Sequence, residues 1–74
     1  MDNDFSFSIE KEFGVLSTSK SGWQTKLALV SWAGREAKFD IRSWSPDASK
    51  MSKGISFTKD ELKSLKELLN SINL

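Results

Sequence analysis

The segment from Lys26 to Trp44 constrains the fold most, because hydrophobic side chains alternate through it in two runs. Successive side chains of an extended strand point to opposite faces of a sheet, so residues of one parity share a face. In both runs the odd positions include bulky apolar residues, namely Leu27, Leu29, Phe39 and Ile41. The pattern predicts two strands that pair as a hairpin across a turn at Ala33 and Gly34.

The even-numbered face of this hairpin mixes basic and aromatic side chains. It carries Lys26, Trp32, Lys38, Arg42 and Trp44. Exposed rings stack with unpaired bases, and cationic side chains meet phosphates, so this mixture is typical of single-stranded nucleic-acid binders. We therefore expect Trp32 and Trp44 to be exposed stacking platforms, and the cations of this face to contact phosphates.

Burial in the core is the alternative for each tryptophan, because large aromatic side chains are buried more often than not. Parity argues against it, since burying Trp32 and Trp44 with the odd-numbered residues requires a slip or bulge in each strand. Trp23 has the odd parity of the apolar residues. We expect Trp23 in the core or at the sheet edge, with the rim of the binding face as the open alternative.

The chain has 74 residues, no cysteine and no histidine. This length predicts one domain over residues 1–74, and the composition argues against disulfides, zinc and cofactors. Small domains bury too little surface to be very stable alone, so we expect a homodimer. No apolar run reaches transmembrane length and the acidic, serine-rich start is unlike a signal peptide. The expected location is the bacterial cytoplasm, including the nucleoid.

Positive charge is concentrated in the middle of the chain, although the net charge is only +1. Residues 20–59 hold eight cations against three anions. This distribution supports a phosphate-binding surface on the central strands and loops, and a mixed-charge solvated surface is the alternative.

Alternation also predicts a first strand from Phe5 to Val15 with one apolar face and a bend or bulge near Gly14. A turn-prone stretch over 17–22 follows, and a short strand is expected over 55–57. Thr58 and Glu61 match a capping box, and the helix that they begin carries an apolar stripe. The stripe comprises Leu62, Leu65, Leu69 and Ile72, with Leu68 beside it.

These elements predict an α+β fold with a four-stranded, curved antiparallel sheet followed by one C-terminal helix. One helix covers at most one face of the sheet. We expect it to cover the odd-numbered face and to leave the even-numbered face solvated.

Two sequence motifs resemble those of a known family. Residues 39–44 read F-D-I-R-S-W, and residues 53–58 read K-G-I-S-F-T before a leucine-rich helix. Together they resemble the C-terminal domain of transcriptional positive cofactor four, in its short bacterial form called YdbC. The resemblance runs from about Leu27 to Leu69 by the order of its motifs.

The resemblance implies a dimer that binds single-stranded DNA with little sequence preference, in transcription or in DNA replication and repair. It places Trp32 at the aromatic that ends strand two, Arg42 and Trp44 at the next motif positions, and Lys50 and Lys53 in the basic loop. Lys26 and Lys38 are assigned by parity alone. The loop after Trp44 is shorter than in the eukaryotic members, and the turn at Ala33 lacks a usual lysine, so coactivator behaviour is implied less strongly than DNA binding.

An enzyme is the least expected class, because no acid–base pair, nucleophile or phosphate-binding loop is recognisable in the sequence. Two alternatives to DNA binding remain open: a single-stranded RNA binder, and a protein-interaction module whose tryptophans form a hot spot.

Overall fold

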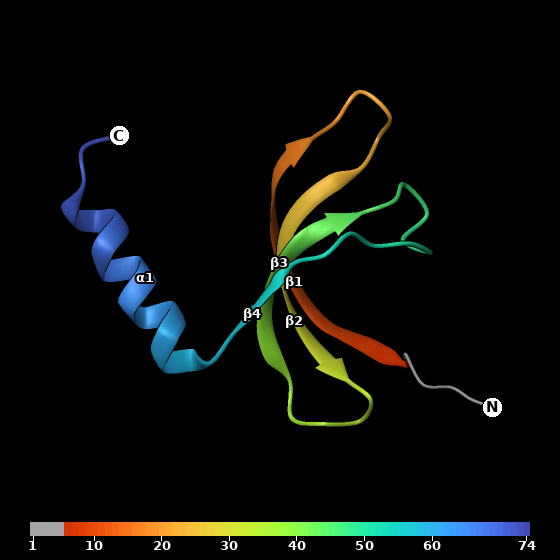
Figure 1. The fold of residues 1–74 in the computed structure, drawn as a ribbon, viewed down its shortest axis with the longest axis horizontal. Helices are drawn as coiled ribbons and strands as arrows, with labels where there is room; N and C mark the ends of the chain where they lie inside the picture. The colour runs from red at the N-terminus through yellow and green to blue at the C-terminus, as the bar shows by residue number, and fades with distance from the viewer. Residues whose placement is uncertain (1–5) are drawn as a thin grey trace.

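The computed structural model describes residues 6–74 and contains four strands followed by one helix. The elements are β1 (Phe7–Thr18), β2 (Gln24–Trp32), β3 (Lys38–Trp44), β4 (Ile55–Phe57) and α1 (Lys59–Ser71). The strands form one antiparallel sheet in the order β1-β2-β3-β4 (Figure 1). The predicted α+β fold is therefore confirmed, and only the expected start of β1 at Phe5 lies outside the described residues.

The hairpin of β2 and β3 divides its residues between the two faces as predicted. Lys26 lies opposite Arg42, and Ala28 lies opposite Asp40, so the even-numbered residues share one face. Ala33 and Gly34 both have positive φ, 53° and 75°, as a type I′ hairpin turn requires. The Arg35 amide donates to the Trp32 carbonyl at 2.9 Å across this turn, which ends β2 at the tryptophan.

The sheet is strongly bent, and α1 stands on the outside of the bend (Figure 1). Odd-numbered side chains, among them Leu27, Phe39 and Ile41, face α1. We call this side the convex face, and the side formed by the even-numbered residues of β2 and β3 the concave face. The Phe7 ring lies 5.7 Å from that of Trp32 and 5.3 Å from that of Trp44.

Those two contacts show how far the sheet curls. Trp32 pairs with Phe7 at one end of β2, whereas Trp44 pairs with Gln24 at the other end. Eight residues of flat strand would separate Gln24 from Trp32 by about 26 Å, too far for one phenyl ring to reach both tryptophans. The bend thus brings the two ends of the concave face together around an aromatic cluster of Phe7, Trp32 and Trp44.

The fully buried residues lie on the concave face, and this corrects the expectation that it is solvated. Ala28, Val30, Asp40 and Trp44 are each at most 1% exposed. The prediction that Trp44 is an exposed platform is therefore wrong. Its ring is covered because the curled sheet folds the concave face onto itself, a geometry that parity alone does not reveal.

The apolar residues of β1 divide between the two faces, so the prediction of one apolar face is also wrong. Phe7 contacts the tryptophans on the concave face, whereas the Phe13 ring lies 5.7 Å from that of Phe39 on the convex face. Register shifts occur between Ile9 and Lys11, between Glu12 and Gly14, and between Val15 and Ser17. The shift beside Gly14 was expected; with the other two it reverses the parity along β1 and bends the strand.

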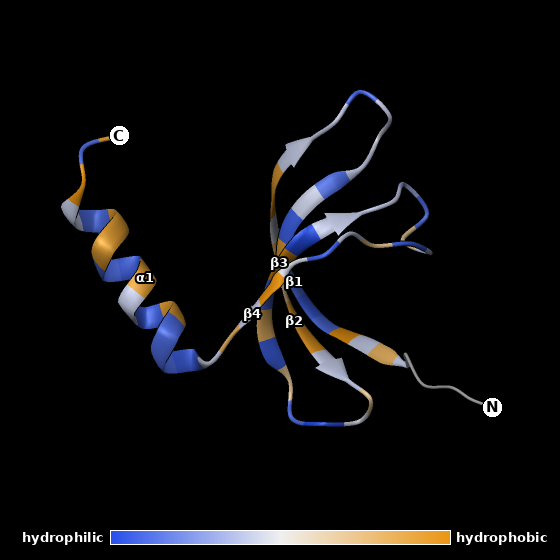
Figure 2. Ribbon diagram, in the orientation of Figure 1, coloured by the Kyte–Doolittle hydropathy of each residue, from blue (hydrophilic) through white to orange (hydrophobic). Residues whose placement is uncertain are grey.

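The helix begins with the predicted capping box. The Glu61 amide donates to Thr58 Oγ1 at 3.1 Å, and the Thr58 amide donates to Glu61 Oε1 at 2.9 Å. No residue of α1 is buried, although one side of it is apolar (Figure 2). Within residues 6–74 there is no helix with the length and hydrophobicity to span a membrane.

Replacing Trp44 with Ala should destabilise the protein by about 3–5 kcal/mol, because a buried ring is lost and a cavity remains. Urea denaturation measures the change. Leu74→Ala is the control, since this side chain is 99% exposed, and its effect should stay within about 0.5 kcal/mol. A loss below about 1 kcal/mol for Trp44→Ala would contradict its burial.

Candidate nucleic-acid interface

The aromatic cluster is held by ring contacts. Phe7 is tilted by about 45° against both tryptophans, an arrangement that aromatic pairs favour. In the part of the chain that the structure describes, the indole N–H groups of Trp32 and Trp44 are buried and find no acceptor. Trp32 is only half-buried, so part of its surface remains open. Of the two predicted platforms, Trp32 is thus the one that a ligand can reach.

A surface hollow of about 570 Å³ opens beside Trp32, and we call it the Trp32 hollow. Three strands and the segment before β4 contribute to it. It is lined by Trp32, Arg42, Met51, Ser52, Lys53 and Ser56. Three of the predicted site residues, Trp32, Arg42 and Lys53, therefore lie together, and two of them carry positive charge.

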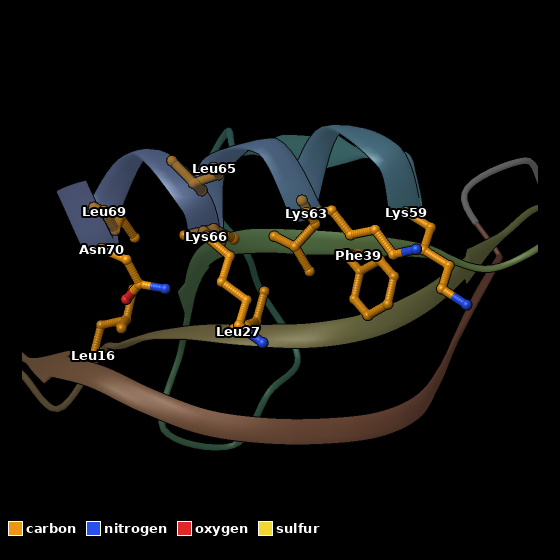
Figure 3. A pocket seen from close by; sticks show the side chains of 11 residues that line it. Leu16, Leu27, Phe39, Lys59, Lys63, Leu65, Lys66, Leu69 and Asn70 are labelled. Atoms are coloured by element: carbon orange, nitrogen blue, oxygen red, sulfur yellow. The ribbon is translucent and has the colours of Figure 1, made fainter.

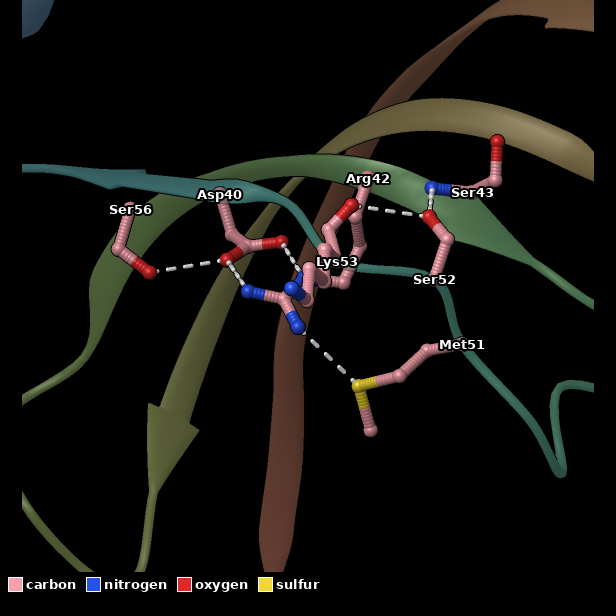
Figure 4. Close-up of polar contacts among 7 residues, drawn as sticks. All are labelled: Asp40, Arg42, Ser43, Met51, Ser52, Lys53 and Ser56. Carbon is pink, nitrogen blue, oxygen red and sulfur yellow. Dashed lines mark hydrogen bonds and ion pairs between the residues drawn. The ribbon is translucent and has the colours of Figure 1, made fainter.

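Asp40 and Arg42 form the polar centre of this site (Figure 4). Arg42 Nε donates to Asp40 Oδ1 at 2.6 Å, and Nη2 donates to Oδ2 at 2.8 Å, so the pair is bidentate. Ser56 donates to Asp40 Oδ2 at 2.9 Å from β4. The carboxylate is 1% exposed and the guanidinium side chain 14%. Asp40 thereby fixes the orientation of the Arg42 guanidinium group.

Arg42 also lies over the Trp32 ring in a cation–π contact. Its Cζ atom is 4.5 Å from the indole centroid. Arg42 Nη1 donates to the Met51 sulfur at 3.3 Å. Met51, Ser52 and Ser56 were not predicted as neighbours of the arginine, although Ser56 stands in the K-G-I-S motif and in the predicted short strand over 55–57.

The close packing around Gly54 explains why the K-G-I-S motif has a glycine at this position. A Cβ built on Gly54 would lie 2.4 Å from Arg42 Cβ, 2.4 Å from the Ile41 carbonyl oxygen and 2.9 Å from Arg42 Nε. Any side chain at this position must displace β3 or the arginine. The two motifs therefore act as one unit, because the glycine allows the chain before β4 to pack directly on Arg42.

The other predicted cations lie apart from the Trp32 hollow. Lys38 and Lys50 are exposed and do not line it. Lys26 donates to Glu12 of β1 at 2.9 Å, and its side chain is 11% exposed. Lys26 is thus engaged by a carboxylate instead of standing open for phosphate. Whether these lysines contact nucleic acid stays a prediction.

The loop that carries Lys50 is organised by Asp47. Its Oδ1 accepts from the Ser49 hydroxyl at 2.7 Å, the Ser49 amide at 3.0 Å and the Ser45 hydroxyl at 2.9 Å. These hydrogen bonds, those of Ser49 first, lower the pKa of Asp47 to about 2. The carboxylate is charged at neutral pH, and it lines a surface hollow together with Lys50.

Trp23 lies directly before β2, at the end of that strand opposite Trp32. It is half-buried and lines a separate hollow with Ser45, Pro46 and Lys50 at the end of the sheet. Trp23 precedes an inner strand and is half-buried, so it lies neither in the buried core nor on an edge strand, and it does not line the Trp32 hollow.

Comparison with known proteins identifies two similarities. Residues 19–68 match the family described as Transcriptional Coactivator p15 (PC4). An uncharacterised protein of Treponema pallidum (strain Nichols) is 47% identical over 74 residues, which cover 100% of this chain and 87% of that protein. The matched family region includes β2, β3, β4 and most of α1, and so all of the lining of the Trp32 hollow.

Replacing Gly54 with Ala should destabilise the protein by roughly 1–3 kcal/mol and move the Arg42 side-chain resonances, because the new methyl group overlaps Arg42. Urea denaturation and nitrogen-15 NMR measure the two effects. Gly14→Ala is the matched control, since a Cβ there meets no atom within 4 Å. Equal stabilities of the two variants would contradict the close packing of Gly54 on β3.

Proposed function

Because the chain belongs to the Transcriptional Coactivator p15 (PC4) family, we propose that it binds single-stranded DNA at the Trp32 hollow, with little sequence preference. The proposal places the protein in transcription or in DNA replication and repair, in the bacterial cytoplasm or nucleoid. The observation that carries it is the meeting of Trp32, Arg42 and Lys53 in one hollow.

The chemistry of the hollow suits an unpaired nucleotide. Indole rings and guanidinium planes stack with bases that are splayed out of a helix, and such stacking tolerates every base. Lys53 is exposed at the same hollow and supplies a charge for the phosphate. The exposed Lys38 and Lys50 extend the positive surface for the rest of the strand. Trp44 is buried in the aromatic cluster against Phe7, so we do not propose that a base stacks on it.

We also propose a homodimer formed through the convex face. A hollow of about 540 Å³ lies between α1 and this face, and its lining is largely apolar (Figure 3). The helix leaves Leu68 64%, Leu69 47% and Ile72 52% exposed. A second copy would cover these side chains with the same apolar surface, which is the self-complementary arrangement of a two-fold dimer.

Single-stranded oligonucleotides should bind more tightly than the blunt duplex of the same sequence, because only unpaired bases can stack on Trp32. Trp32→Ala should weaken single-strand binding by about 1–3 kcal/mol. Lys53→Ala should flatten the logarithmic salt dependence by about 0.7. Fluorescence anisotropy at several salt concentrations measures all three quantities.

Lys11→Ala is the control for these titrations, since Lys11 lies opposite Leu29 on the convex side of the sheet, lines neither hollow and should leave the salt dependence unchanged. Equal affinity for duplex and single strand would contradict stacking at Trp32. An affinity that does not change with salt concentration would instead favour a protein-interaction module. Tighter binding of a matched RNA strand than of the DNA strand would favour an RNA binder.

Leu68→Asp should dissociate or unfold the protein, because it places a charge in the proposed dimer interface. Glu67→Lys is the control, since it changes the charge on the polar side of the same helix. Sedimentation equilibrium with circular dichroism measures assembly and folding together. A wild-type protein that is folded and monomeric at micromolar concentration would contradict the dimer.

A further inference from the structure

The positive charge of Arg42 is neutralised within the protein. Both oxygens of Asp40 accept from its guanidinium group, at 2.6 Å and 2.8 Å. Asp40 is 1% exposed, so this carboxylate is held at the arginine and is not free to move away. A paired arginine brings little net charge to a phosphate and releases few counterions, unlike an exposed lysine.

The orientation of the guanidinium plane is also fixed by its neighbours. Trp32 lies against it at 4.5 Å, Gly54 packs on its stem, and Ser56 bonds the carboxylate that holds it. Four residues, from three strands and the segment before β4, therefore restrain one side chain. Such restraint favours recognition of a planar group, because little conformational entropy remains to be lost on binding.

Donors of Arg42 remain for a ligand. A guanidinium carries five N–H groups. Its contacts with Asp40 and Met51 use three of them, one of which goes to sulfur, a weak acceptor. The remaining N–H groups belong to Nη1 and Nη2. They suit the carbonyl oxygens and ring nitrogens along the edge of a base.

We propose that Arg42 contacts a nucleobase in the Trp32 hollow and is not a phosphate contact, whereas Lys53 on the same hollow is the phosphate contact. Asp40, Ser56 and Gly54 act as positioning residues for the guanidinium. This inference rests on the proposed binding of single-stranded DNA. It replaces the expectation from charge alone that Arg42 meets a phosphate.

Arg42→Lys tests the proposal, because lysine keeps the charge and loses the planar fork. The variant should bind an oligothymidylate about 5- to 150-fold more weakly, the range of one lost base contact. The slope of its salt dependence should stay that of the wild type. On an abasic single strand of equal length, which has phosphates but no bases, the loss should fall below about twofold.

Lys53→Ala is the internal reference for a phosphate contact. Its salt slope should flatten by about 0.7, and its loss of affinity should be the same on the abasic strand as on the oligothymidylate. The wild-type protein gives a second measurement that does not depend on a variant folding. The nitrogen-15 resonance of Arg42 Nε should shift when the oligothymidylate is added and stay in place with the abasic strand.

Two results would overturn the inference. One is an Arg42→Lys protein with wild-type affinity, or with an equal loss on both strands. The other is an Arg42 Nε resonance that shifts equally with both strands. A wild-type protein that binds no single strand at low salt would instead overturn the proposed function, so the two failures are distinguishable.

Discussion

The buried carboxylate of Asp40 is the constraint on which the site depends. It accepts hydrogen bonds from Arg42 on its own strand and from Ser56 on β4, and so it fixes the edge strand to the sheet. Taking an ion pair out of water is costly, and breaking one by removing a partner costs about 3–5 kcal/mol. The buried ion pair lies where the guanidinium of Arg42 contacts Trp32, so the free-energy cost of burying it falls at the binding site.

The elements could be predicted because their periodicities are simple. A period of two predicted β2, β3 and β4, and the capping box predicted the start of α1. The coverage of the faces could not be predicted in the same way. Parity states which residues share a face, but the burial of Trp44 depends on how far the sheet bends.

The site shows the same division between local and long-range information. Arg42 and Trp32 share parity, and Lys53 belongs to a motif, so their meeting could be anticipated from the sequence. The contact of Phe7 with the two tryptophans could not be anticipated, because three register shifts change which face the later residues of β1 share with Phe7. Lys26 was expected to be open, but the irregular pairing of β1 brings Glu12 to it at 2.9 Å.

The register shifts of β1 make the strand more sensitive to deletions than to substitutions. Each one is an extra residue that has no counterpart on β2, and it decides to which face all later side chains of β1 point. A substitution in β1 alters one side chain, whereas a deletion of one residue reverses the faces of all residues beyond it. The spacing between Phe7 and Phe13 therefore carries more of the fold than the identity of the exposed residues between them.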